Sequence, residues 1–270
     1  MTSTSASQER SRPVKTAAIV THARVDVKDA VARVEAVAAA AGVKLVDDPR
    51  EAELVIVLGG DGTMLRTLAR LLGSGVPVLG VNFGRVGFLA SIRPENLERD
   101  LRRVFAGAYV LVELPTIEVS LDGERHIAVN DVVATSSILG RMVELAWAIG
   151  GEDLGTVSCD GMICSTPTGS TAYNLSNGGP VLVRGLDAMA VTFIAPHSLH
   201  VRPLVVPRGL EVTVRNATAD VPAALLVDGH PVGDLAPGAE VAVYLSDEKS
   251  LLATLPETTF FSRYRETFTS

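Results

Sequence analysis

Residues 54–63 read LVIVLGGDGT, so that an apolar run is followed by three glycines around one aspartate. Continuous rather than alternating apolar residues are typical of a parallel strand that is covered on both faces. The next residues, Met64–Leu72, have helical periodicity. The stretch therefore predicts a strand–turn–helix unit of an α/β fold, with glycines that leave backbone N–H groups accessible at the helix start.

This glycine turn can serve either chemistry or structure. N–H groups at a helix N-terminus bind phosphate, and open α/β sheets place ligands at the carboxyl ends of their strands. Asp61 would repel phosphate unless it holds a metal or accepts a proton from an attacking hydroxyl, as phosphoryl transfer requires. The structural alternative is a tight turn in which Asp61 caps the helix at Thr63. The turn matches neither the dinucleotide fingerprint G-x-G-x-x-G nor a P-loop.

The sequence around this turn alternates between strand and helix signals. This alternation predicts an α/β domain with a parallel sheet over residues 14–108, after a disordered polar tail over 1–13 that lacks a secretory signal. Besides the unit above, we expect strands over 16–22, 43–46 and 76–81, a helix between Asp26 as cap and Gly42 as end, and a helix over 94–105.

After about residue 109 the pattern changes to short strands joined by turns. It predicts a mostly-β domain over 109–255, with a single helix signal at 169–176, and then a C-terminal tail over 256–270. The aromatic residues of this tail and the apolar β half favour subunit contacts in a homodimer or homotetramer. Strands are expected over 110–121, 125–134, 141–149, 156–165, 191–194, 210–214, 223–227 and 240–245.

The composition disfavours several classes of function. The net charge is −7 with only 4% aromatic residues and no basic run, which argues against a nucleic-acid or membrane surface. No apolar run reaches the roughly 18 residues of a membrane span. Cys159 and Cys164 lie in one strand-like stretch and are expected to be reduced thiols of a cytoplasmic protein. No histidine has the spacing of a zinc motif.

A second polar cluster occupies residues 158–180, SCDGMICSTPTGSTAYNLSNGGP. An apolar strand runs into a hydroxyl-rich turn, which suits a ribose, an amide or a phosphate. Asp160 repeats the Asp-Gly pair of the first turn. Asn130 and Asp131 interrupt an apolar strand, where polar groups cost stability unless they are paired. Each feature alone is compatible with a turn or a cap, but together they indicate a binding site.

These segments resemble the ATP-NAD kinase family over about residues 17–255. The GGDGT element is shared with lipid and phosphofructokinase-type kinases, whereas TPTGSTAY is much narrower. The resemblance rests on LGGDGT at 58–63, VNFGRVGFL at 81–89, Asn130-Asp131, DGMICSTPTGSTAYNLSNGGP at 160–180 and APHSLHVRPLVVP at 195–207.

The resemblance implies a Rossmann-like N-terminal domain and a C-terminal β domain that together phosphorylate the adenosine 2′-hydroxyl of NAD to give NADP. ATP or polyphosphate would be the donor, and Mg²⁺ or another divalent cation would be carried mainly by the nucleotide. Asp61 would be the general base, and the two clusters are expected to meet across an interdomain cleft. The implied binding residues are Gly60, Gly62, Thr63, Arg66, Asn130, Asp131, Arg141, Ser158, Asp160, Thr171, Ala172, Tyr173, Asn174, Leu175, Ser176 and His230.

This chain departs from the family pattern at several of these positions. Asp131 stands where glutamate is common, and His230 stands where glutamine is frequent, which makes hydrogen bonding there pH-sensitive. The small side chain of Ser158 leaves NADH open as an acceptor beside NAD. Arg66 can equally be a solvated surface arginine, and Tyr173 a packing residue.

Two other functions fit parts of the sequence. A lipid or sugar kinase would share only the GGDGT turn, and the absence of a membrane-binding stretch and the second cluster argue against it. A non-catalytic dinucleotide sensor would keep the pocket but would not need Asp61.

Overall fold

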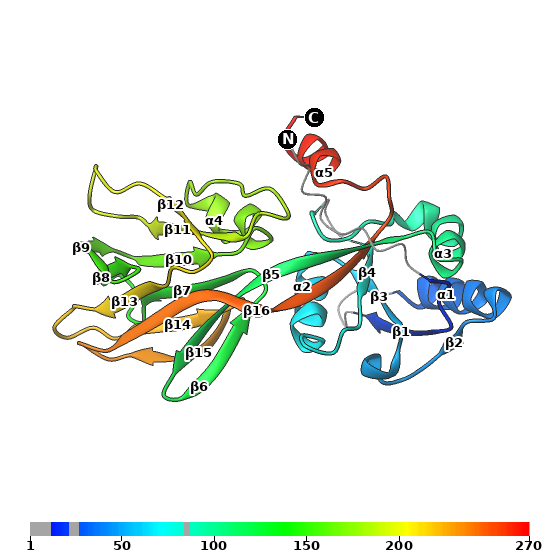
Figure 1. Cartoon of the computed structure of the whole chain (residues 1–270), viewed down its shortest axis with the longest axis horizontal. Helices are drawn as coiled ribbons and strands as arrows, with labels where there is room; N and C mark the ends of the chain where they lie inside the picture. The colour runs from blue at the N-terminus through cyan, green and yellow to red at the C-terminus, as the bar shows by residue number, and fades with distance from the viewer. Residues whose placement is uncertain (1–11, 22–26, 84–86, 270) are drawn as a thin grey trace. The chain divides into compact units, whose positions relative to one another are not determined.

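The computed structural model describes residues 12–21, 27–83 and 87–269 of the 270-residue chain (Figure 1). The chain forms two compact units, the first from the residues up to Leu114 together with those from Lys249 on, and the second from Pro115–Glu248. Two long strands, β5 (Val110–Leu121) and β16 (Glu240–Thr254), run from one unit into the other. Residues 249–255, expected in the β domain, therefore belong to the first unit, because the end of β16 pairs there with β4.

The first unit is an α/β domain built on a parallel sheet, as expected. Its order is β2-β1-β3-β4-β16, and neighbouring strands in this part of the sheet pair in parallel. Every residue of the central strand, β3, is buried, which explains its continuous apolar sequence. The other strands are β1 (Thr16–Thr21), β2 (Lys44–Leu45) and β4 (Val78–Asn82), and β3 spans Leu54–Gly59.

Helices cover this sheet. α1 (Lys28–Ala41) packs against α3 (Leu97–Phe105), and α2 (Asp61–Arg70) packs against β3 and β4 (Figure 1). α1 ends at Gly42 with a left-handed φ of 69°, as predicted, whereas the predicted cap Asp26 lies outside the described residues. Two short 3₁₀ turns, η1 (Pro49–Glu51) and η2 (Pro94–Asn96), complete the connections.

The C-terminal residues form a helix, α5 (Phe260–Phe268), rather than the expected tail. Thr259 and Ser262 make a capping box, with the Thr259 hydroxyl accepting from Ser262 N at 3.1 Å and the Ser262 hydroxyl accepting from Thr259 N at 3.0 Å. This reciprocal cap satisfies two N–H groups at the helix start and lets the short helix form.

The second unit is mostly β, as expected, and antiparallel. One of its sheets has the order β12-β11-β10-β7-β14-β15. The strands β16-β13-β8-β9 continue the sheet of the first unit into the second, and β5 pairs with β6 in that same sheet. The bounds are β6 (Glu124–Ala128), β7 (Asp131–Ser136), β8 (Val143–Ile149), β9 (Glu152–Cys159), β10 (Gly161–Ser165), β11 (Ala188–Ile194), β12 (Leu204–Pro207), β13 (Val212–Asn216), β14 (Ala223–Val227) and β15 (His230–Leu235).

Two predicted strands are wrong, because each is two strands. The expected strand 125–134 breaks at Val129-Asn130, and 156–165 breaks at Asp160. At both places the chain leaves one sheet and enters the other. Cys159 and Cys164 therefore lie on different strands, and both are buried free thiols.

The predicted helix over 169–176 is present as two short pieces, η3 (Gly169–Thr171) and α4 (Tyr173–Ser176), which are separated at Ala172. None of the described helices has the length and apolar character needed to cross a membrane.

Candidate active site

The GGDGT turn joins β3 to α2 in the first unit. Gly59 ends the strand, Gly60 is the extended N-cap, and Asp61 is the first helical residue. A Cβ at Gly59 would lie 2.8 Å from the hydroxyl of Thr63, so packing requires that glycine. A Cβ at Gly60 or Gly62 would meet nothing within 4 Å. Internal packing therefore explains the first glycine only, and the other two leave open space at the helix N-terminus.

Asp61 does not cap its own helix at Thr63, so this structural alternative is wrong. Its carboxylate accepts hydrogen bonds from the backbone N–H of Phe88 at 2.8 Å and of Leu89 at 3.3 Å, while Thr63 N donates to Gly60 O at 3.0 Å. A Cβ at Gly87 would overlap the Asp61 carboxylate, so glycine permits this close approach. The carboxylate is thus half-buried and fixed in direction by the segment that follows β4.

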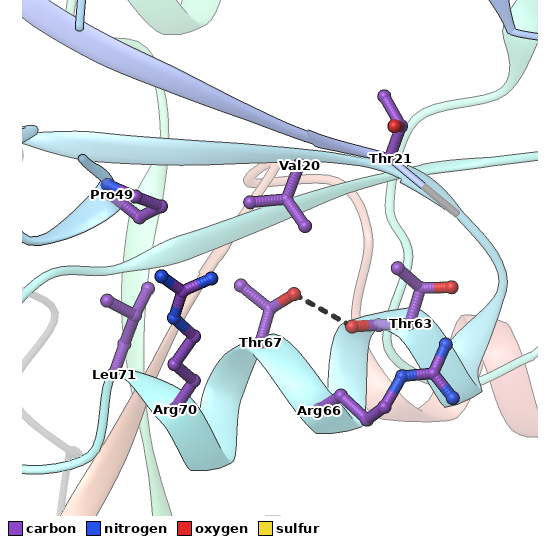
Figure 2. A pocket seen from close by; sticks show the side chains of 8 residues that line it. All are labelled: Val20, Thr21, Pro49, Thr63, Arg66, Thr67, Arg70 and Leu71. Atoms are coloured by element: carbon purple, nitrogen blue, oxygen red, sulfur yellow. Dashed lines mark hydrogen bonds between the residues drawn. The ribbon is translucent and has the colours of Figure 1, made fainter. Parts of the chain in front are cut away.

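A small cavity of about 190 Å³ lies between the face of α2 and the end of β1 (Figure 2). Arg66 and Arg70 are one helical turn apart on its wall, and the Thr67 hydroxyl donates to Thr63 O at 2.8 Å. The cavity is smaller than the roughly 300–1,000 Å³ of typical ligand pockets, so it is too small for a whole nucleotide. Its two guanidinium groups favour an anionic group. The lining residues are Val20, Thr21, Pro49, Thr63, Arg66, Thr67, Arg70 and Leu71.

In the second unit, Asp228 holds the turn that contains Asn130. One carboxylate oxygen accepts from Asn130 N at 2.7 Å and Asp131 N at 3.2 Å, and the other accepts from Val129 N at 2.9 Å. Asp228 has a left-handed φ of 48° in the turn between β14 and β15. Sequence reasoning did not identify this role, because the partners are about 98 positions apart.

Asp131 is buried, with 6% of its surface exposed. Burial, reinforced by the negative charge of Asp228, raises the pKa of the Asp131 carboxyl to about 7. Burial also raises the pKa of Asp228, against the opposing effect of its three N–H donors. A carboxyl with a pKa near neutrality is typical of functional sites.

The TPTG turn packs directly on Asn130. Thr166 N donates to Asn130 O at 2.8 Å, and the Thr166 hydroxyl donates to Val129 O at 2.6 Å. A Cβ at Gly169 would overlap the Asn130 carbonyl group. In the described parts of the chain, Asn130 Oδ1 and the Thr168 hydroxyl are buried without a hydrogen-bond partner. Such atoms are rare in folded proteins, so this pair is a candidate position for ligand groups.

Asn174 has an internal role in this cluster. It is fully buried, its amide donates to Ser170 O at 3.2 Å and Pro180 O at 3.0 Å, and its oxygen accepts from Thr192 at 2.7 Å. Asn174 therefore fixes the turn, while its neighbours form the surface. Ala172, Tyr173 and Ser176 are exposed, and Thr171 and Leu175 are half-buried.

The remaining predicted residues lie elsewhere in this unit. Asp160 lies between β9 and β10, and the half-buried Ser158 lies near the end of β9. In the antiparallel pairing of β7 with β10, Gly161 lies opposite Thr135 and Ser165 lies opposite Asp131. Continued by one residue at each end, this register places Asp160 six positions along the strand from Asn130, a distance of about 20 Å.

Arg141 and His230 make their own local contacts. Arg141 is exposed and forms an ion pair with Asp220 at 3.0 Å. His230 is exposed, with Nδ1 3.0 Å from Asp228 O. The structure thus joins Asn130, Asp131, Asp228, His230 and the 166–176 turn in one cluster, whereas the side chain of Arg141 pairs with Asp220.

Comparison with known proteins identifies related sequences. Models of the ATP-NAD kinase N-terminal domain and the ATP-NAD kinase C-terminal domain match residues 9–109 and 129–255. The NAD kinase of Heliobacterium modesticaldum is 40% identical over 228 residues, which are 83% of this chain and 81% of that protein. The NAD kinase of Gemmatimonas aurantiaca is 39% identical over 225 residues, or 81% and 77% of the two chains.

Two solved structures superimpose on most of this chain. An Archaeoglobus fulgidus NAD kinase in complex with ATP superimposes with a TM-score of 0.78 at 26% identity, over 94% of this chain and 97% of that one. Yeast NADH kinase complexed with NADH gives a TM-score of 0.84 over 94% and 87% of the chains, and at 22% identity it shows the fold alone. The chain belongs to the ATP-NAD kinase family.

Proposed function

We propose that this chain is an NAD kinase, which transfers the terminal phosphoryl group of ATP to the adenosine 2′-hydroxyl of NAD and releases NADP and ADP. The observation that carries this proposal is the Asp61 carboxylate, which is held at a helix N-terminus by the N–H groups of Phe88 and Leu89 beside two glycines that packing does not require. Family membership supplies the substrate class.

Asp61 would act as the general base. It accepts the proton of the 2′-hydroxyl while the oxygen forms its bond to the γ-phosphorus and the bond from phosphorus to the bridging oxygen breaks, so that ADP leaves with that electron pair. Two fixed N–H donors keep the carboxylate in one orientation, which supports such a role because proton transfer needs a heavy-atom distance of about 3 Å.

The donor phosphates would lie at the start of α2. Backbone N–H groups at Gly60 and Gly62 suit phosphate oxygens, because a helix N-terminus carries a partial positive charge. Thr63 and the exposed Arg66 lie on the wall of the small cavity beside this turn (Figure 2), and a guanidinium binds phosphate with two donors.

The acceptor NAD would bind to the cluster of the second unit. Asn130 Oδ1 and the Thr168 hydroxyl are buried groups that need partners, and ribose or amide groups of a dinucleotide supply them. Tyr173 exposes 46% of its surface and presents a ring on which a base can stack. We place Asp160 and Ser158 at a separate part of the same dinucleotide site, since strand spacing keeps them away from Asn130.

A divalent cation would reach the site with the nucleotide. Across the described ranges no group of three or more His, Cys, Asp or Glu side chains gathers into a metal site. The ion supplies charge neutralisation on the phosphates, and Mg²⁺ usually takes phosphates, water and one or two carboxylates as ligands. We further propose that the enzyme works in the cytoplasm as a homodimer or homotetramer.

A direct assay tests this function. The purified chain is incubated with NAD or NADH and with ATP or polyphosphate in the presence of Mg²⁺, and NADP or NADPH is measured through a coupled dehydrogenase. The proposal predicts NADP formation from NAD and ATP. Dinucleotide binding without turnover on any donor would instead identify a non-catalytic sensor.

A further inference from the structure

Helix α5 packs on the segment that holds Asp61. The ring of Phe88 lies 5.8 Å from the ring of Phe260 and 5.8 Å from that of Phe268, at the two ends of the helix. Tyr264 lies 4.9 Å from Phe268 and joins the same aromatic cluster. Phe88 therefore has two contacts of different kinds, because its backbone N–H donates to Asp61 while its ring packs on α5.

A buried arginine reinforces this contact. Arg263 on α5 is 6% exposed, and its guanidinium donates to Ala90 O at 2.5 Å and to the Glu266 carboxylate at 3.0 Å. Arginine is almost never so buried unless it is paired, since removing its charge from water is costly. The hydrogen bond to Ala90 O connects the helix to the main chain two residues beyond Phe88.

The other side of the same segment is held by β4. Ser91 N and Ile92 N both donate to Gly80 O, at 3.1 and 3.0 Å. A Cβ at Gly80 would lie 2.8 Å from the Cα of Ala90, so the two main chains touch. Residues 90–92 thus contact β4, while Phe88 and Ala90 contact α5, so that Ala90 is held by both elements.

We propose that α5 is a positioning element for catalysis, in which Arg263 and Phe268 hold the Phe88–Leu89 main chain so that its N–H groups orient the Asp61 carboxylate. The inference rests on the proposed role of Asp61 as general base. Misplacement of a reacting group by about 1 Å costs on the order of 10²-fold in rate. Loss of the α5 contacts is therefore expected to lower kcat while substrate binding is retained.

The test compares three variants on α5 in the full-length enzyme. Arg263→Ala removes the bond to Ala90 O, and Arg263→Lys keeps a positive donor. Phe268→Ala removes the ring contacts with Phe88 and Tyr264 at the last turn of the helix. Arg265→Ala is the matched control, because this arginine is exposed on the same helix. For each variant kcat, the KM values for NAD and ATP, the calorimetric NAD affinity and the circular dichroism spectrum are measured.

We expect Arg263→Ala to lower kcat by about 10- to 100-fold with both KM values within about two-fold of the parent. Arg263→Lys should recover part of this loss, and Phe268→Ala should lower kcat in the same way by a smaller factor. Arg265→Ala should match the parent. If Arg263→Ala does not fold, Phe268→Ala, whose ring is 41% exposed, carries the test.

Other results would overturn the inference. An unchanged kcat with only a lower Tm would make α5 purely structural, and a raised KM with full kcat would place it in substrate binding. An equal loss in Arg265→Ala would show a non-specific charge effect. A parent enzyme that makes no NADP refutes the proposed function itself, whereas an active parent with unaffected variants refutes the positioning role alone.

Discussion

At the scale of single residues, the candidate site contains three carboxylates in different surroundings. Asp61 is half-buried and bound by two N–H groups, Asp228 is bound by three, and Asp131 is buried beside Asp228. Asp61 can be selected as a candidate from the sequence alone, because a charge among glycines after a buried strand is unusual. The role of Asp228 is not visible there, because its partners are distant along the chain.

Asp131 predicts a pH-dependent stability. Its pKa is about 7 in the folded protein and about 4 in an unfolded chain, so between these values the folded state binds a proton that the unfolded state lacks. The free energy of unfolding therefore falls as the pH rises from about 4 to about 7, and above pH 7 this loss of stability stays constant. Asp131→Asn, which cannot ionise, removes this fall.

Urea denaturation at pH 5 and pH 8 measures the effect. The difference in free energy of unfolding between Asp131→Asn and the parent should favour the variant by on the order of 2 kcal/mol more at pH 8 than at pH 5. The control is Asp122→Asn, an exposed carboxyl in a hairpin turn, which should show the same small difference at both pH values. A pH-independent difference for Asp131→Asn would contradict the raised pKa.

At the scale of elements, periodicity predicted the parallel strands and their helices, since buried strands have continuous apolar sequences. Periodicity failed near Asn130 and Asp160, where the chain passes from one sheet to the other. The sequence stays apolar on both sides of each break, so two strands were predicted as one. The helix α5 was missed as well, although Thr259 and Ser262 form a capping box and Phe260, Tyr264 and Phe268 recur at helical spacing.

The TPTG turn gives a prediction at this scale. Gly169→Ala should displace the turn from Asn130, because the added Cβ overlaps the Asn130 carbonyl group. We expect NAD affinity, measured by calorimetry, to fall by about 10-fold or more, as for the loss of about 1.4 kcal/mol of binding free energy. Circular dichroism checks the fold. Unchanged NAD affinity in a folded variant would remove this turn from the proposed NAD site.

At the scale of the whole molecule, the sequence predicted an α/β part and a β part, and both are present. The return of the chain to the first unit through β16 was not predictable from the local pattern. Periodicity indicates a strand but does not reveal which unit the strand belongs to. The candidate residues likewise divide between the units, with Asp61 and Arg66 in the first and Asn130 and the TPTG turn in the second.

The proposed homodimer or homotetramer predicts the molecular mass of the protein in solution. The second unit exposes large apolar side chains such as Leu139 and Leu199, which water solvates poorly and which a subunit interface would bury. Light scattering coupled to size exclusion should give at least twice the chain mass of 28.4 kDa. A single species at the mass of one chain would contradict the oligomer.

Replacement of the proposed base tests the catalytic mechanism most directly. Asp61→Asn removes the proton acceptor and keeps the side-chain size, so NADP formation should fall by about 10²- to 10⁴-fold. Calorimetric NAD affinity should stay close to that of the parent, and Asp47→Asn, an exposed carboxyl in the same unit, should retain full activity. Undiminished NADP formation by Asp61→Asn would contradict the assignment of Asp61 as the general base.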